Sequence, residues 1–103
     1  MGKTAKKAKL KTTRFDSSEY LDSPEAISEY LTAALETGDA SFIATSIGRV
    51  ARAQGMAEIA RQAGLSRENL YRSLNGDTKA ELDTIMRVLT ALGVTLTAKS
   101  KVA

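Results

Sequence analysis

The sequence contains no cysteine and no histidine among its 103 residues. Without cysteine there are no disulfides and no thiolate nucleophile, and without histidine there is no imidazole catalyst and no zinc-finger ligand set. Proline occurs once and aromatic residues make up only 5% of the chain, which favours a helical domain packed with leucine, isoleucine and alanine. We therefore expect neither a metal nor a cofactor, and no enzyme activity.

Long hydrophobic runs are also absent. No apolar stretch approaches the roughly 20 residues of a membrane helix, and the basic first residues are not followed by the apolar core of a secretory signal. Hydrophobic residues make up 43% of the chain and charged residues 26%, as is ordinary for a globular domain. We expect a soluble, cytoplasmic protein with one domain and a tail.

The charged residues are segregated along the chain. Residues 1–14 contain six Lys/Arg and no acid, residues 15–48 contain seven Asp/Glu and no Lys or Arg, and residues 49–103 contain nine Lys/Arg and five Asp/Glu. Such segregation predicts one anionic and one cationic partner. The alternative is a solvated tail and solvated acidic helix faces that bind nothing.

Five stretches place apolar residues at helical spacing between a capping residue and a stop signal. They cover about residues 23–38, 39–55, 56–63, 66–75 and 79–92. The predicted N-caps include Ser23, Asp39 and Ser66, because their side chains can accept a hydrogen bond from the first turn. The predicted core stripe of the last helix is Leu82, Ile85, Met86, Leu89 and Leu92.

After Gly93 the period changes to the alternation VTLTA in residues 94–98, which predicts a short β-strand. No other segment is a comparable strand, and a lone strand is unstable, so it requires a partner from another chain. We predict that two copies pair through it, with Val94 and Leu96 packed on the helices. The alternative is an extended tail that lies on the core.

Residues 55–77, GMAEIARQAGLSRENLYRSLNGD, predict two short helices joined at Gly64. Glycine adopts the left-handed conformation of such a turn at little cost. Leu70 and Leu74 are predicted to face the core. This pattern indicates a helix-turn-helix whose second helix is exposed.

An exposed α-helix fits the major groove of B-DNA, where arginine pairs with guanine and polar groups contact the phosphates. The predicted DNA-binding residues are Ser66, Arg67, Glu68, Tyr71 and Arg72 on the second helix and Asn75, Thr78 and Lys79 after it. The alternative is a helical hairpin with a solvated polar face.

The segment MAEIARQAGLSRENLYRSLNGDTKAELDTIMRVLTALGVTLT resembles HigA-like addiction-module antidote proteins of the Xre/lambda-repressor-like helix-turn-helix family. With the upstream FDSSEYLDSPEAISEYLTAALETGD the resemblance covers residues 15–98, and GLSRENLYRSL is its most specific part. It implies an all-α, five-helix lambda-repressor-like domain that neutralises a RelE/ParE-type toxin and represses the shared operon as a homodimer. Ala57 departs from the family pattern, in which Gln, Ser or Thr often contacts a phosphate.

These observations divide the chain into a basic tail (1–14), an acidic helical extension (15–38), a helix-turn-helix domain (39–93) and a dimerisation strand with its tail (94–103). We predict that the acidic extension binds the toxin. Its apolar anchors are predicted to be Phe15, Tyr20 and Leu21, which precede the helix and have no evident core role. The alternative is an acidic cap on the domain's own core.

Other functions remain open at this stage. A stand-alone prophage-type repressor without a toxin partner would keep the helix-turn-helix and would not require the acidic extension. A pure protein-interaction adaptor would make Arg67 and Arg72 incidental. Scattered carboxylates and lysines on amphipathic helices argue against an enzyme, because solvation explains them.

Overall fold

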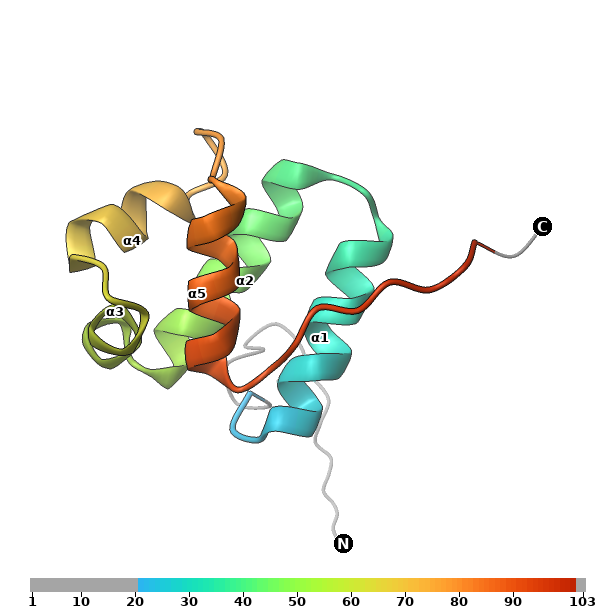
Figure 1. Cartoon of the computed structure of the whole chain (residues 1–103), viewed down its shortest axis with the longest axis horizontal. Helices are drawn as coiled ribbons and strands as arrows, with labels where there is room; N and C mark the ends of the chain where they lie inside the picture. The colour runs from blue at the N-terminus through green and yellow to red at the C-terminus, as the bar shows by residue number, and fades with distance from the viewer. Residues whose placement is uncertain (1–20, 102–103) are drawn as a thin grey trace, which may run out of the picture.

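The computed structural model describes residues 21–101, which form five α-helices (Figure 1). The helices are α1 (Pro24–Glu36), α2 (Ala40–Gln54), α3 (Met56–Ala63), α4 (Arg67–Ser73) and α5 (Leu82–Leu92). The predicted all-α class with five helices is confirmed. None of these helices is long and apolar enough to cross a membrane. The predicted basic tail, residues 1–14, lies outside the described residues.

The starts of α1 and α2 are fixed by the capping residues that the sequence predicts. The Ser23 Oγ accepts a hydrogen bond from the Ala26 N–H at 3.2 Å, and Pro24 occupies the first turn, where no N–H is needed. The Asp39 Oδ1 accepts one from the Phe42 N–H at 3.1 Å. Each bond satisfies an amide that has no partner inside its helix.

α2 lies between the other helices. α1 packs on one side of it, while α3 and α5 pack on the other and α4 attaches to α3 (Figure 1). The Arg49 guanidinium donates a hydrogen bond to the Tyr30 hydroxyl at 3.0 Å, which ties α2 to α1. Val50, Leu70 and Val88 have no exposed surface and mark the centre of the core.

The start of α5 differs from the prediction. The sequence predicts a helix from Lys79, whereas α5 begins at Leu82 after Glu81, whose backbone is extended (φ −73°, ψ 145°). The preceding residues instead close the turn after α4, where the Thr78 hydroxyl donates to the Arg72 carbonyl at 2.8 Å. Leu82 is 69% exposed and Met86 44% exposed, so their assignment to the core stripe was wrong; the side of α5 that faces the core carries Val88, Leu89 and Leu92.

Leu21 also lies elsewhere than predicted. It is only 2% exposed and belongs to the hydrophobic core, and its carbonyl accepts a hydrogen bond from the Gln54 side chain. The interpretation that Leu21 has no core role was therefore wrong, because Leu21 belongs to the core cluster although it precedes the first helix. Its side chain is not available to a partner.

The C-terminal segment, residues 94–101, is extended but is not a β-strand. It runs across α1 (Figure 1) and is held by a hydrogen bond of 3.0 Å from the Val94 N–H to the Leu89 carbonyl and by an ion pair of 3.0 Å between Lys99 and Glu36. No strand is present in residues 21–101, because a single chain offers this segment no strand to pair with. Val94 and Leu96 pack on the core, as predicted.

Candidate nucleic-acid interface

The turn between α3 and α4 is built around Gly64. Its backbone is left-handed (φ 73°, ψ 31°), and the Leu65 N–H donates to the Ala60 carbonyl at 2.9 Å while the Gly64 N–H donates to the Arg61 carbonyl at 3.2 Å. This pair of bonds ends α3 and turns the chain within three residues. The two helices therefore keep a fixed angle, as the sequence predicts.

The inner face of α4 is fixed by its cap and its two leucines. The Ser66 Oγ accepts a hydrogen bond from the Asn69 N–H at 3.0 Å. Leu70 is fully buried and Leu74 is 2% exposed, both in the core cluster. With these residues turned inward, the opposite side of the helix faces solvent.

The outer face of α4 carries the side chains predicted to bind DNA. Arg67, Glu68, Tyr71 and Arg72 are all exposed. The Arg67 guanidinium lies over the Tyr71 ring, 5.8 Å from its centroid, and the Arg72 guanidinium donates a hydrogen bond to the Asn69 side chain. Both arginines thus contact a neighbour on their own helix and remain exposed to solvent.

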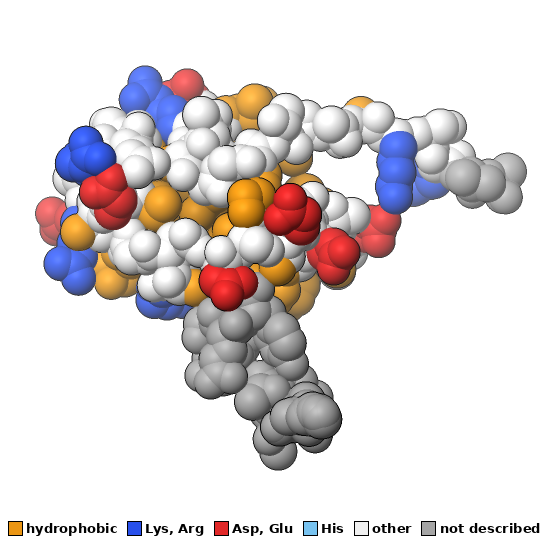
Figure 2. Space-filling model, turned by 90° about the horizontal axis from the view of Figure 1, so that it is seen from below, with side chains coloured by type: hydrophobic (Ala, Val, Ile, Leu, Met, Phe, Trp, Pro, Cys, Tyr) orange, Lys and Arg blue, Asp and Glu red, His pale blue; other side chains and the backbone are white. Residues whose placement is uncertain are grey.

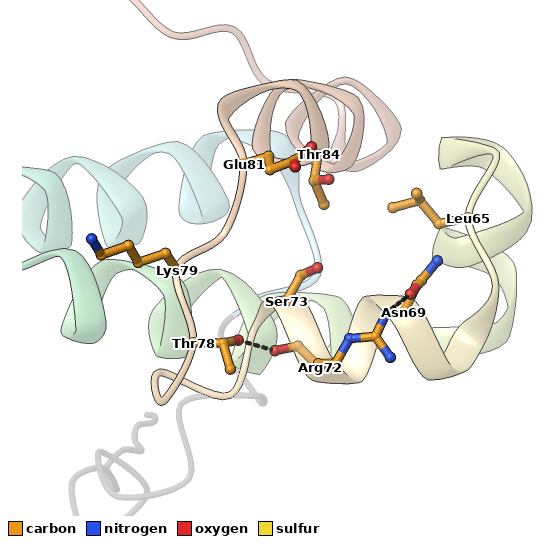
Figure 3. A pocket seen from close by; sticks show the side chains of 8 residues that line it. All are labelled: Leu65, Asn69, Arg72, Ser73, Thr78, Lys79, Glu81 and Thr84. Carbon is orange, nitrogen blue, oxygen red and sulfur yellow. Dashed lines mark hydrogen bonds between the residues drawn. The ribbon is translucent and has the colours of Figure 1, made fainter.

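A hollow of about 330 Å³ lies between α4, the loop after it and the start of α5 (Figure 3). Its lining residues are Leu65, Asn69, Arg72, Ser73, Thr78, Lys79, Glu81 and Thr84. The structure therefore brings together three of the predicted residues, Arg72, Thr78 and Lys79. Asn69 and Ser73 also line this hollow, although no sequence pattern indicates that these two residues lie beside the loop.

The loop residues also have structural tasks. The Asn75 side chain accepts a hydrogen bond from the Asp77 N–H at 2.8 Å, which shapes the turn after α4. The Ser41 hydroxyl on α2 donates to the Gly76 carbonyl at 2.8 Å and ties the loop to α2. Thr78 and Lys79 are exposed beside this loop, which places them next to the outer face of α4.

α4 is also held against α2 by a close approach that the sequence does not reveal. A Cβ added to Gly48 would lie 2.9 Å from the Leu74 carbonyl oxygen and 3.1 Å from the Leu74 Cβ. The separation from the carbonyl oxygen is shorter than Cβ atoms adopt next to backbone, so a larger residue at position 48 would force α2 and the end of α4 apart. A glycine within a helix is a weak signal, and for this reason the contact could not be predicted.

α3 carries a charged cluster on its exposed side. The Glu58 carboxylate accepts hydrogen bonds from the Arg61 guanidinium and, at 2.6 Å, from the Gln62 side chain. The hydrogen bond from Arg61 is the largest cause that lowers the pKa of Glu58 from 4.5 to about 2. At neutral pH the Arg61 guanidinium is therefore paired with a carboxylate of its own helix, whereas Arg67 and Arg72 contact the uncharged side chains of Tyr71 and Asn69.

This cluster gives a direct test of the arrangement. Replacing Arg61 with alanine removes the main partner of the Glu58 carboxylate, so the pKa of Glu58 should rise towards 4.5. An NMR titration of the side-chain carboxyl resonance measures this shift. An unchanged midpoint in Arg61→Ala would show that the pair does not form in solution, and Glu81→Gln is a control that should leave the Glu58 titration unaffected.

A second charged surface lies on α1. Glu25, Glu29 and Glu36 are exposed, and residues 15–48 contain no Lys or Arg. In the view from below, several acidic side chains lie on the right, near the lysines of the C-terminal segment, while the left-hand edge carries Lys and Arg side chains together with further acidic ones (Figure 2). One of the α1 carboxylates, Glu36, pairs with Lys99 at 3.0 Å.

Of the predicted toxin anchors, only Leu21 lies within the described residues. Leu21 is buried, as stated above. Phe15 and Tyr20 lie outside the described residues. Leu35 on α1 is 39% exposed and is therefore open to a partner.

The fold is a small all-α domain in which the short helices α3 and α4 are joined by a tight glycine turn and α1 carries exposed acidic side chains. Residues 11–100 match a protein family described as probable addiction module antidote protein, and the chain therefore belongs to this family of antitoxins. Membership implies a toxin partner in general.

One relative comes from Haemophilus influenzae (strain ATCC 51907 / DSM 11121 / KW20 / Rd). The chain is 41% identical to this uncharacterized protein over 80 residues, which are 78% of this chain and 82% of the relative. No solved structure matches the chain.

Proposed function

We propose that this antidote neutralises a RelE/ParE-type toxin by direct binding and represses its own operon through a lambda-repressor-like helix-turn-helix formed by α3 and α4. The observation that carries the proposal is the separation of two surfaces of opposite character, an arginine-bearing helix and an acidic helix, on one small domain. Two partners of opposite charge can then be bound at different places.

The DNA-binding part of the proposal rests on α4. A helix that projects Arg67, Tyr71 and Arg72 from a rigid turn fits the major groove, where arginine pairs with guanine through two hydrogen bonds. Thr78 and Lys79 lie at the end of the same surface, where they meet the phosphate backbone. Operators of such proteins have two half-sites about 34 Å apart, so the repressor acts as a homodimer.

The toxin-binding part rests on the acidic face of α1. RelE/ParE-type toxins are, by the family resemblance, small basic proteins that act on nucleic acid or its enzymes. Glu25 and Glu29 supply an opposing potential, which speeds association and selects the partner. Apolar anchors supply the affinity, and these are Phe15 and Tyr20 before the helix and Leu35 on it.

The first experiment is capture of the toxin. The chain is co-expressed with the open reading frame beside its gene, purified by affinity and tested for a stoichiometric complex. A promoter fragment of the same operon is then used in a gel shift at several salt concentrations, because phosphate contacts make binding salt-dependent. A gel shift without any captured toxin would leave a stand-alone repressor as the function.

The toxin surface is tested by charge reversal. The double variant Glu25→Lys, Glu29→Lys should slow association with the toxin by about tenfold or more at low salt, because steering then acts in the opposite direction. Stopped-flow fluorescence measures the association rate. The double variant Glu68→Lys, Asp77→Lys changes the charge equally near α4 and is the matched control. Equal slowing by both pairs would show that only net charge matters.

A further inference from the structure

The Arg87 guanidinium joins α5 to the end of α3. Its Nε donates a hydrogen bond to the Asp83 carboxylate at 3.0 Å on the same helix, and its Nη1 donates one to the Ala63 carbonyl at 3.4 Å. Ala63 is the last residue of α3 and is followed by the turn into α4. One side chain of α5 therefore contacts the point from which α4 departs.

The Ala63 carbonyl needs a partner from outside α3, because the last four carbonyl groups of a helix have none within it. The two amides that follow Ala63 donate to the carbonyls of Arg61 and Ala60, at 3.2 and 2.9 Å. Arg87 adds a third donor that is charged, and a cation at a helix C-terminus is also attracted by the negative end of the helix dipole. α5 thus supplies a cap for α3.

Gly64 leaves room for this guanidinium. A Cβ added at position 64 would lie 3.2 Å from the Arg87 Nη1, and the left-handed backbone (φ 73°) also favours glycine there. The guanidinium therefore lies against the backbone of the turn. Ser66, two residues later, caps α4, and Arg67 is its first residue.

Asp83 gives the Arg87 side chain its direction. The carboxylate engages Nε, and this leaves Nη1 turned towards α3. Both side chains are at least half exposed, so the ion pair by itself contributes little to stability. Its effect is to hold a flexible side chain in an orientation that reaches the Ala63 carbonyl.

We propose that Arg87 is a positioning residue for operator recognition, because it holds the start of α4 in place through the turn at Gly64. The far end of α4 lies against α2, where Gly48 approaches Leu74. With seven residues α4 is short, so a small shift of either end changes where the Arg67 side chain projects. The inference rests on the proposed function and deepens it by naming a residue that acts on recognition through another element.

Base readout is more sensitive to such a shift than phosphate contact is. A bidentate pair with guanine requires donors at fixed positions in the major groove. Phosphate contacts depend mainly on charge and carry no sequence information. Loss of the Arg87 cap should therefore lower the affinity for the operator more than the affinity for a scrambled duplex.

The deciding experiment compares Arg87→Met with the unaltered full chain. Methionine keeps an unbranched apolar stem and removes the guanidinium, so packing changes little. The ratio of the affinity for a duplex from the chain's own promoter to that for a scrambled duplex should fall by about three- to tenfold. Fluorescence anisotropy measures both affinities. A general loss of folded protein would lower the two affinities equally and leave this ratio unchanged.

Amide hydrogen exchange, measured by NMR without DNA, tests the contact itself. In Arg87→Met the protection of the Gly64 and Leu65 amides should fall by about three- to tenfold, because the turn opens more often without its charged donor. The Phe42 amide is held by a separate cap, Asp39, and should keep its protection.

Two controls separate the cap from the loss of charge and from the ion pair. Arg61→Met removes an equally charged side chain, which pairs with Glu58 on α3, and should leave the affinity ratio unchanged. The charge exchange Asp83→Arg, Arg87→Asp restores an ion pair on α5, but an aspartate offers no donor to the Ala63 carbonyl. This double variant should therefore remain as defective as Arg87→Met.

Unchanged protection of the Gly64 and Leu65 amides in Arg87→Met would overturn the proposal, as would an affinity ratio restored by the charge exchange. An unchanged ratio in Arg87→Met would do the same if Arg67→Ala lowers it. If the unaltered chain shows no preference for its own promoter, the proposed function fails and the role of Arg87 in recognition falls with it. The exchange result, obtained without DNA, would still decide whether Arg87 holds the turn.

Discussion

Replacing Leu70 with alanine should lower the free energy of unfolding by about 2–5 kcal/mol. Leu70 has no exposed surface and lies in the core cluster with residues of α2, α3 and α5. Its truncation leaves a cavity where α4 meets the domain, and a short helix cannot move inward without breaking its hydrogen bonds to the turn. Thermal or urea denaturation followed by circular dichroism measures the loss.

Tyr71→Ala is the matched control for this change. Tyr71 is the next residue of α4 and is 40% exposed, so its loss should cost much less stability than that of Leu70. Similar midpoints for the two variants would mean that the inner face of α4 is not packed as the structure shows. The comparison also separates loss of fold from loss of binding in any operator assay.

Removing the arginines of α4 should weaken operator binding far more than it affects the fold. Arg67→Ala and Arg72→Ala should each cost about 1–3 kcal/mol of binding free energy if each side chain pairs with a base. Both side chains are exposed, so the unfolding midpoint should stay nearly unchanged. Fluorescence anisotropy with an operator duplex and with a scrambled duplex distinguishes base readout from phosphate contact.

The control for the loss of charge is Lys101→Ala, which removes one exposed cation from the C-terminal segment. It should alter affinity for both duplexes slightly and equally. If the double variant Arg67→Ala, Arg72→Ala still binds the operator as tightly as the unaltered chain at moderate salt, α4 is not the recognition helix. Loss of affinity for both duplexes in parallel would assign the arginines to phosphates.

The helices could be predicted from the sequence because their ends depend on local chemistry. Ser23, Asp39 and Ser66 each accept a hydrogen bond from an amide three residues on, as a capping residue does. Gly64 adopts the left-handed turn that its position requires. These interactions span a few residues, so spacing and residue type are sufficient to find them.

The predictions that were wrong depended on contacts between residues far apart in the chain, or on a partner strand that the described residues do not contain. The fate of Leu21 depends on α2, which lies about thirty residues further along the chain and supplies Gln54. The alternation in residues 94–98 indicates extended backbone correctly, but a strand also needs a partner, which the periodicity of one segment cannot provide. The start of α5 was placed too early because helical spacing does not show that Thr78 is used by the preceding turn.

The residues of the candidate site could be predicted from the sequence. The contacts that hold α4 in place could not. Arg67, Tyr71 and Arg72 are exposed as expected, since Leu70 and Leu74 take the opposite side of a helix. The contact between Gly48 and Leu74 and the bond from Ser41 to Gly76 hold that helix against α2. Neither contact can be recognised from the spacing of apolar and polar residues, because each joins residues far apart in the chain.

The neighbouring residues Gly48 and Arg49 give α2 a role as a common support. Gly48 faces Leu74 at the end of α4, and Arg49 donates a hydrogen bond to Tyr30 of α1, so one helical turn contacts both of these elements. A displacement of α1 caused by one partner would therefore act on the same turn of α2 that positions α4. The tilt of α4 relative to α1 is consequently a property of α2, and a methyl group at position 48 would change it.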